Sequence, residues 1–262
     1  MLSPFSHTFF PSFIKSNGNG NSTGSTGEQD SSFNKSVKIA KGMLVSFLII
    51  LATFIVVFSL VFSISDFLVI LGLSFLFIGP AYIANAMMVF TSDGRPIDGG
   101  KNFIDGKRLF GQTKTWGGLI GGIIFGFLAA LLFNFIFFWN FPAIEAYAIT
   151  QSALLKYISV IYLQAFLNPP VYLIPIRAFF CGLGAPLGDL VKSFFKRRLS
   201  IGSGKPFWIA DQLDFIVATI LLNLAWFPTD PFIIILLLVM TPAITLTANN
   251  VAFFIGKKTE PW

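Results

Sequence analysis

The chain has 262 residues, of which 55% are hydrophobic, 16% are aromatic and only 11% carry a charged side chain. Soluble domains carry charge on about 25% of their residues, so this composition and a mean hydropathy of +0.77 exclude an ordinary soluble domain. The net charge of +6 comes from short basic clusters between apolar runs, as in loops that flank membrane spans, and we expect no nucleic-acid partner. One cysteine and one histidine exclude an intrachain disulfide and make zinc or histidine acid–base chemistry a poor fit.

The amino-terminal segment 1–36 is predicted to be a disordered polar tail. Residues 17–27 form a Gly, Ser and Asn tract with too little apolar surface to order itself. The segment does not have the layout of a cleaved signal peptide, because the first long apolar run begins only at Met43.

Residues 43–90 are apolar except for the interruption at 63–66. One membrane span needs about 20 residues, so this stretch predicts two spans in a tight hairpin, over 43–63 and 67–90. We treat 37–66 as an additional amino-terminal transmembrane helix. Lys35, Lys38 and Lys41 precede the apolar run that begins at Met43, which predicts a cytoplasmic amino terminus.

The second span contains Pro80 and Asn85. Proline frees a backbone carbonyl and asparagine adds an amide inside the membrane, features that favour a helix facing a cavity or a neighbouring helix. A kinked helix whose Asn85 bonds to its neighbour is the alternative, and the sequence leaves both open.

Residues 91–115 form the first polar loop, which carries five cations and is predicted to be cytoplasmic. Its glycines allow backbone N–H groups to approach an anion, and Lys107, Arg108 and Lys114 can supply charge to several phosphates. A basic loop that binds no ligand explains the same residues if the loop is considered alone.

The rest of the chain predicts four more spans and a second polar loop. The basic residues alternate consistently with six crossings, which place both polar loops and both termini on the cytoplasmic side. The expected fold is therefore an all-α, polytopic membrane helical bundle whose two cytoplasmic loops form the site. The predicted segments are spans 116–139, 171–187, 207–227 and 231–255, the loop 189–206, a membrane domain over 67–256 and a cytoplasmic tail over 257–262.

Three carboxylates and five cations lie within Gly188–Asp214. If the fourth span continues as a helix past Asp189, then Asp189, Lys192, Ser193 and Lys196 share one face. Asp211 and Asp214 are three residues apart at the start of the next span and also share a face. The two helices are neighbours, so the three carboxylates can converge on one or two hard divalent cations, for which we predict Mg²⁺.

The neighbouring cations predict a polyphosphate ligand. When a phosphate monoester attacks the α-phosphorus of a nucleoside triphosphate, the nucleophile is already anionic, so positioning and charge neutralisation carry the catalysis without a histidine. A salt-bridged loop that merely anchors helices is the alternative reading of the same charges.

Five motifs, in order between residues 67 and 255, resemble those of the CDP-archaeol synthase family. They are Asp98-Gly99-Gly100, Phe103-x-Asp105-Gly106-x-Arg108, Lys114-Thr115-Trp116-x-Gly118, Gly188-Asp189-Leu190-x-Lys192-Ser193-x-x-Lys196-Arg197-Arg198, and Asp211-Gln212-Leu213-Asp214-Phe215. The last two are specific and are also similar to the signature of CDP-diacylglycerol synthases. The Lys-Asp and His-Gly-Gly elements of that relative are missing, which favours the archaeal branch.

The resemblance implies an integral cytidylyltransferase of the plasma membrane that joins CTP to unsaturated archaetidic acid, an isoprenoid ether lipid phosphate, giving CDP-archaeol and pyrophosphate with Mg²⁺. It implies a metal role for Asp189, Asp211 and Asp214 and a catalytic, phosphate-gripping role for Lys114, Lys192 and Lys196. The implied substrate-binding residues are Pro80, Asn85, Lys107, Arg108, Ser193 and Arg197. The resemblance implies nothing about oligomeric state.

Two features depart from the family pattern. The family usually has five spans, so residues 1–63 are an addition, and Gly117 stands where the family often has arginine. We expect removal of residues 1–36 to leave activity intact. The alternatives left open are another membrane nucleotidyl- or phosphosugar-transferase acting on a lipid phosphate, and a lipid transporter or scramblase. A transporter predicts charges in the middles of several spans, where this chain has Arg177 and otherwise scattered amides.

Overall fold

The structure is a computed structural model and describes residues 25–151, 173–224, 226 and 229–255. The chain divides into two units, 1–36 and 37–262. The described residues form helices and loops, with two isolated β-bridges and no strand. The helices are α1 (Ser25–Val61), α2 (Ile64–Phe90), α3 (Trp116–Gln151), α6 (Leu173–Arg198), α7 (Trp208–Leu224) and α8 (Pro231–Phe254).

Five of these helices are long and apolar enough to cross a membrane, namely α1, α2, α3, α6 and α8. The expected all-α, polytopic membrane bundle of about six helices is confirmed, and among the helices that the structure describes α7 is the one shorter than a full span. Helix α7 has 17 residues, which span about 26 Å against an apolar core of about 30 Å. Its first two turns hold Asp211, Gln212 and Asp214, so only the remainder is continuously apolar. The fifth expected span is therefore a short helix with a polar start.

The hairpin between the first two helices lies where the polar interruption predicted it. Ser63 caps α2: its side chain accepts the N–H of Asp66, and the Asp66 carboxylate accepts the N–H of Ser63. This reciprocal pair satisfies two N–H groups that a helix start leaves free. Helix α1 begins at Ser25, inside the segment expected to be a polar tail.

Helix α2 contributes most to the largest apolar core. Its residues Phe77, Ile78 and Ala81 are fully buried and pack with α7 and α8. The Tyr82 hydroxyl donates to Thr241 Oγ1 of α8 at 2.8 Å, and its ring meets Phe215 of α7 edge to face. These contacts hold α7 and α8 against α2.

Helix α6 continues past its expected end at residue 187 and remains helical to Arg198. The condition for Asp189, Lys192, Ser193 and Lys196 to share a face is therefore met, and the second polar connection is 199–207 instead of 189–206. The helix packs on α3 and α7. A Cβ at Gly188 would lie 2.3 Å from the carbonyl oxygen of Asp214, so a glycine is needed for this approach to α7.

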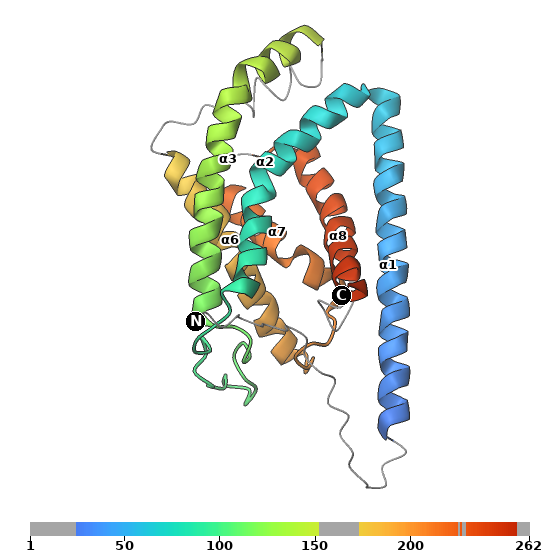
Figure 1. Cartoon of the computed structure of the whole chain (residues 1–262), viewed down its shortest axis with the longest axis vertical. Helices are drawn as coiled ribbons and strands as arrows, with labels where there is room; N and C mark the ends of the chain where they lie inside the picture. Colours follow the sequence, from blue (N-terminus) through green and yellow to red (C-terminus); the bar gives the residue numbers. More distant parts are fainter. Residues whose placement is uncertain (1–24, 152–172, 225, 227–228, 256–262) are drawn as a thin grey trace, which may run out of the picture. The chain divides into compact units, whose positions relative to one another are not determined.

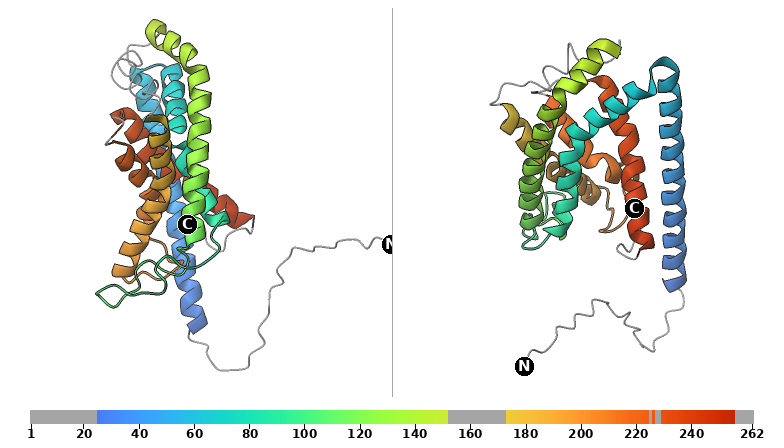
Figure 2. Two further views of the ribbon diagram at one scale, coloured as in Figure 1. Left: turned by 90° about the vertical axis from the view of Figure 1, so that its left-hand side faces the viewer. Right: turned by 45° about the horizontal axis from the view of Figure 1, so that its top comes forward.

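Both polar connections lie at one end of the bundle. Figure 1 shows the green α2–α3 loop and the α6–α7 loop at the lower end of the helices, and the turned views agree (Figure 2). The even number of crossings between the loops accounts for this. The charged residues of both loops can therefore meet. The predicted tail 257–262 and the polar segment around Lys156 lie outside the described residues, and the predicted domain boundaries stay predictions.

We expect Gly188→Ala to destabilise the protein by about 2 kcal/mol, because the added methyl forces α6 away from the α7 backbone. Gly72→Ala in α2 is the matched control, since a Cβ there meets nothing within 4 Å. Thermal unfolding in detergent measures both. Equal midpoints for the two variants would contradict the close approach of α6 and α7 at this point.

Candidate functional site

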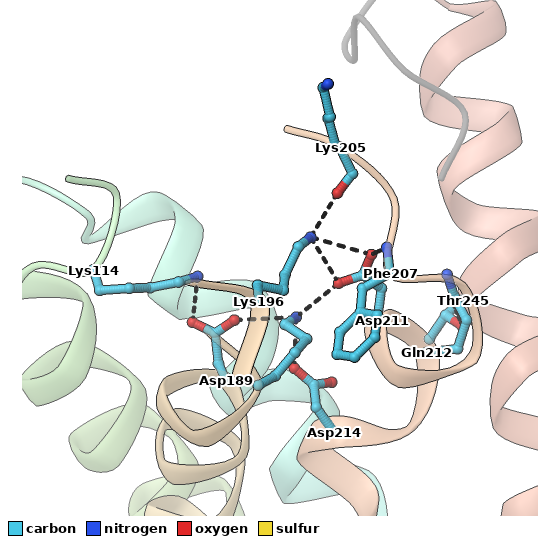
Figure 3. Close-up of polar contacts among 10 residues, drawn as sticks. Lys114, Asp189, Lys196, Lys205, Phe207, Asp211, Gln212, Asp214 and Thr245 are labelled. Carbon is cyan, nitrogen blue, oxygen red and sulfur yellow. Dashed lines mark hydrogen bonds and ion pairs between the residues drawn. The ribbon is translucent and has the colours of Figure 1, made fainter. Parts of the chain in front are cut away.

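Six charged side chains from three parts of the chain meet at the polar end of the bundle (Figure 3). The first polar loop, α6 and the start of α7 each contribute, and every member is at least three-quarters buried. Three are carboxylates and three are ammonium groups, so their charges cancel. We call them the six-residue cluster: Lys114, Asp189, Lys192, Lys196, Asp211 and Asp214.

The ammonium of Lys192 lies between the three carboxylates. Its Nζ is 2.7 Å from Asp214 Oδ2, 3.2 Å from Asp189 Oδ1 and 3.4 Å from Asp211 Oδ1. The other carboxylate oxygen of Asp189, Oδ2, forms an ion pair with Lys114 Nζ at 2.6 Å. The three carboxylates are therefore gathered around the ammonium group of Lys192, and their predicted role in binding a metal ion stays a prediction.

Lys196 and Asp211 tie the start of α7 to the end of α6. Lys196 Nζ donates to the carbonyl of Lys205 at 2.6 Å and lies 3.3 Å from Asp211 Oδ1. Asp211 Oδ2 also accepts the N–H of Phe207 at 2.6 Å. The α7 end of the connection 199–207 is thus held beside the cluster.

Gln212, between the two aspartates of α7, points the other way. It is buried, and its Oε1 accepts the hydroxyl of Thr245 in α8 (Figure 3). The bond between Gln212 and α8 fixes the rotation of α7 about its own axis. In this orientation Asp211 and Asp214 point toward α6. We did not assign Gln212 from the sequence.

Asp98 organises the first polar loop. Its carboxylate accepts two hydrogen bonds from Arg108, at 2.9 Å each, and the N–H groups of Gly100, Phe110 and Gly111. Gly100 and Gly111 have positive φ, which lets their N–H groups turn toward it. The Arg108 guanidinium, aided by these N–H groups, holds the pKa of the Asp98 carboxyl well below its usual range.

Asp98→Asn should therefore weaken the hydrogen bonds that order the first polar loop. We expect the amides of Gly100 and Gly111 to exchange hydrogen about tenfold faster or more, after correction for the pH dependence of exchange. Because the folded-state pKa is lowered, this stabilisation is complete above the ordinary aspartate pKa of about 4 and is lost as pH falls through the folded value. Wild-type protection should be constant between about pH 5 and 8. The exposed Asp93→Asn in the same loop is the control. Equal protection in both variants would show that Asp98 does not hold the loop.

Arg198, at the end of α6, binds the first polar loop. Its Nε lies 2.7 Å from Asp105 Oδ2, and its Nη2 donates to the carbonyls of Lys107 and Arg108. The guanidinium also stacks over Phe103 and Phe194, at 5.0 and 4.3 Å from the ring centres. The sequence did not single out Arg198 from its basic run, because its carboxylate partner lies in another loop.

The structure gives several predicted substrate-binding residues partners within the protein. The Arg108 guanidinium is held by Asp98, and Lys107 Nζ donates to Arg198 O and Ser200 Oγ at 2.7 Å each. Ser193 is buried, and Arg197 is half-buried on the adjacent part of α6. The roles predicted for these four residues in binding a substrate stay predictions.

A cavity of about 430 Å³ opens beside the cluster. Lys114, Asp189 and Asn85 line it together with Gln112 and Thr113 of the first polar loop. Asn85 therefore faces a cavity, as one of the two readings of the second span expected. Pro80 is buried within α2 and does not line this cavity.

A comparison with known families bears directly on this arrangement. The family model described as "CarS-like: CDP-archaeol synthase" matches residues 64–166 and 146–262, which covers α2 to α8 and both polar loops. The chain belongs to the CDP-archaeol synthase family. The resemblance carried by the five motifs is thereby confirmed, and the protein is a multi-pass membrane protein.

Curated members of the CDP-archaeol synthase family match most of the chain. The CDP-archaeol synthase of Thermococcus onnurineus is 38% identical over 189 residues, covering 72% of this chain and 95% of its own. That of Methanosarcina mazei is 35% identical over 191 residues, covering 70% and 99%. A solved structure described as an intramembrane enzyme for archaeal membrane lipid biosynthesis aligns over 67% of this chain and 91% of its own, with 28% identity and a TM-score of 0.47.

Two departures from the CDP-archaeol synthase pattern have counterparts in the structure. The family match begins at residue 64, where α2 begins, so α1 precedes the matched region. A Cβ at Gly117 would lie 2.2 Å from the carbonyl oxygen of Asp93 and 2.5 Å from that of Thr91. The start of α3 therefore packs directly on the end of α2, and no side chain fits at position 117.

Proposed function

We propose that this protein transfers the cytidylyl group of CTP to an isoprenoid ether lipid phosphate in the membrane, releasing pyrophosphate and forming CDP-archaeol. The observation that carries the proposal is the six-residue cluster, in a chain of the CDP-archaeol synthase family. Three buried carboxylates and three ammonium groups converge where membrane-spanning helices end. Buried charge is costly in a helical membrane protein unless it is paired, and ionisable groups within such proteins mark sites that bind charged ligands.

The reaction needs little covalent chemistry from the protein. An anionic oxygen of the lipid phosphate attacks the α-phosphorus of CTP, a new P–O bond forms, and the bond to the β-phosphate oxygen breaks to release pyrophosphate. Lys114, Lys192 and Lys196 neutralise the phosphate oxygens, and the buried setting strengthens each of these interactions. Asn85 and Gln112 line the adjoining cavity and can donate amide hydrogens to the nucleotide.

The residues present fit a divalent cation in their donor chemistry. Asp189, Asp211 and Asp214 offer hard carboxylate oxygens, the ligands that Mg²⁺ prefers, and all three already share one cation of the chain. Among the described residues no group of three such side chains is gathered closely enough to enclose a metal ion. Mg²⁺, when bound, would act as a Lewis acid and neutralise phosphate charge. The ammonium group of Lys192 would have to move away from some of the carboxylate oxygens that it now contacts.

The test is transfer by the purified full-length protein, supplied with CTP, Mg²⁺ and digeranylgeranylglycerol phosphate. We expect CDP-lipid by mass spectrometry and one pyrophosphate per product, with ATP, GTP and UTP much poorer donors. Transfer of a labelled sugar phosphate from a nucleotide sugar, with no product from CTP, would replace the proposal with the phosphosugar alternative. Neither product with any donor would reject a transferase.

The proposal also places the site on the cytoplasmic side of the plasma membrane. Support comes from the five cations in the first polar loop and the basic end of α6. Lys101→Cys in the exposed part of that loop tests it, because the chain's natural cysteine, Cys181, is buried. We expect a membrane-impermeant maleimide to label the variant in inverted vesicles and to leave it unlabelled in intact cells; the reverse pattern would invert the topology.

A further inference from the structure

A second cavity reaches the six-residue cluster from another direction. It is a groove of about 580 Å³ between α6 and α7. Three lining residues of α6 and the residue directly after its end recur at every fourth position, which is one stripe along a helix. They are Leu187, Val191, Phe195 and Leu199, and they face Leu213, Val217 and Leu221 of α7 across the groove.

The rim of the groove is open to the surroundings of the bundle. Val191, Phe195 and Leu221 are 47%, 53% and 63% exposed. Apolar side chains this exposed on membrane helices face lipid acyl chains, so the groove opens sideways into the bilayer. A chain that lies in it is continuous with the apolar interior of the membrane.

The inner side of the groove is charged. Among the described residues that line it, Lys192 and Asp214 carry charge, and they form the 2.7 Å ion pair of the cluster. The groove therefore connects an apolar surface with an ammonium group. That combination matches a molecule with a long apolar chain and an anionic head.

The groove and the cavity beside Lys114 lie on opposite faces of α6. Pro186, Asp189 and Leu190 of α6 line the cavity, whereas Leu187, Val191 and Phe195 line the groove. At about 100° per residue, the centres of these two sets are roughly 150° apart around the helix. Asp189 and Lys192 sit between them, so two ligands can reach the cluster without sharing a passage.

This arrangement suits the proposed reaction, in which the attacking and leaving oxygens lie roughly in line on opposite sides of phosphorus. The cavity beside Lys114 is bordered by the polar loop and suits the nucleotide. The groove is almost wholly apolar and suits the lipid. A further apolar cavity near Gly72 and Phe133 has no charged residue in its lining and does not connect lipid with charge.

We propose that the groove between α6 and α7 holds an isoprenoid chain of the lipid phosphate substrate and brings its phosphate to Lys192. The proposal rests on the proposed function and adds the route and site of the lipid. Pro80, which the resemblance implies as a substrate-binding residue, is buried inside α2 and does not line this groove.

Val191→Trp and Val217→Trp test it, because each fills the groove from an exposed rim position and so leaves the helix core unchanged. We expect the KM for the digeranylgeranyl phosphate to rise about tenfold, the effect of displacing about two buried methylene groups. The KM for CTP and the rate with a short-chain ether lipid phosphate should stay within about twofold. Leu128→Trp, at an exposed position of α3 outside the described cavities, is the matched control.

A photoreactive amino acid at position 191 gives a readout that does not depend on turnover. We expect it to crosslink a tritiated digeranylgeranyl phosphate, and an excess of the unlabelled compound to suppress the crosslink. Crosslinking that the unlabelled compound leaves unchanged, or tryptophan variants that affect long and short substrates equally, would overturn the groove as the lipid site. Absence of CTP turnover in the wild type would instead reject the proposed function, while the crosslink still decides the groove.

Discussion

Asp214→Asn should reduce CDP-lipid formation by about 1,000-fold while the protein still inserts and folds. The variant keeps the shape of the side chain and removes its charge. Asp214 is the most buried carboxylate of the cluster, with 6% of its side chain exposed, and it makes the shortest contact with Lys192. Its loss removes one of three ligands proposed for the divalent cation and leaves the cluster with one excess positive charge.

The fold should survive this change because Lys192 keeps two carboxylates. Asp189 and Asp211 remain within 3.4 Å of its Nζ, so no buried ammonium is left unpaired. Gel filtration and thermal unfolding in detergent check the fold, and transfer from CTP is measured at saturating lipid phosphate. Asp93→Asn, an exposed aspartate of the first polar loop, is the control and should behave as the wild type.

Raising the Mg²⁺ concentration separates two reasons for inactivity. If Asp214 is a metal ligand, excess Mg²⁺ should recover part of the lost rate, because the remaining donors still bind the ion weakly. Activity of Asp214→Asn within about twofold of the wild type would refute any catalytic role for this carboxylate.

The sequence predicted the carboxylate cluster because helical spacing carries the needed information. Asp189, Lys192 and Lys196 repeat at one face of a helix, and Asp211 and Asp214 do the same on its neighbour, so two local patterns and one short connection suffice. The membrane helices followed from hydropathy for the same reason, because hydropathy is a local property of the chain. The orientation that the basic loops predict stays a prediction.

What the sequence did not predict depends on contacts between distant segments. The pairing of Arg198 with Asp105 and the bond from Thr245 to Gln212 join residues of different elements, and no spacing rule selects them. The lysine at the centre of the carboxylates was likewise unforeseen. The resemblance implies a phosphate-gripping role for Lys192, but the orientation of its side chain depends on how closely Gly188 lets α6 approach α7.

That central position makes Lys192→Gln the second decisive variant. Removing one of three ammonium groups leaves the cluster with a net charge of −1, and the vacated space is bordered by three carboxylates. We expect the dissociation constant for Mn²⁺, without nucleotide, to fall about tenfold, because the ion no longer competes with an ammonium group for the same oxygens. Transfer should nevertheless fall about 100-fold or more, because a phosphate contact is lost.

Thermal stability gives an independent measure of the competition between Lys192 and a divalent cation for the three carboxylates. Without divalent ions, the three carboxylates of Lys192→Gln repel one another, so the variant should unfold at a lower temperature than the wild type. An ion that binds only the folded protein stabilises it, so added Mn²⁺ should restore the midpoint temperature of thermal unfolding. This midpoint should rise more steeply with Mn²⁺ concentration in Lys192→Gln than in the wild type. Lys101→Gln, in the exposed part of the first polar loop, also removes one positive charge and is the control. It should neither lower the unfolding temperature nor change the response to Mn²⁺. If Lys192→Gln instead bound Mn²⁺ more weakly than the wild type, the lysine would be a scaffold for the carboxylates, and the cation would have to bind elsewhere.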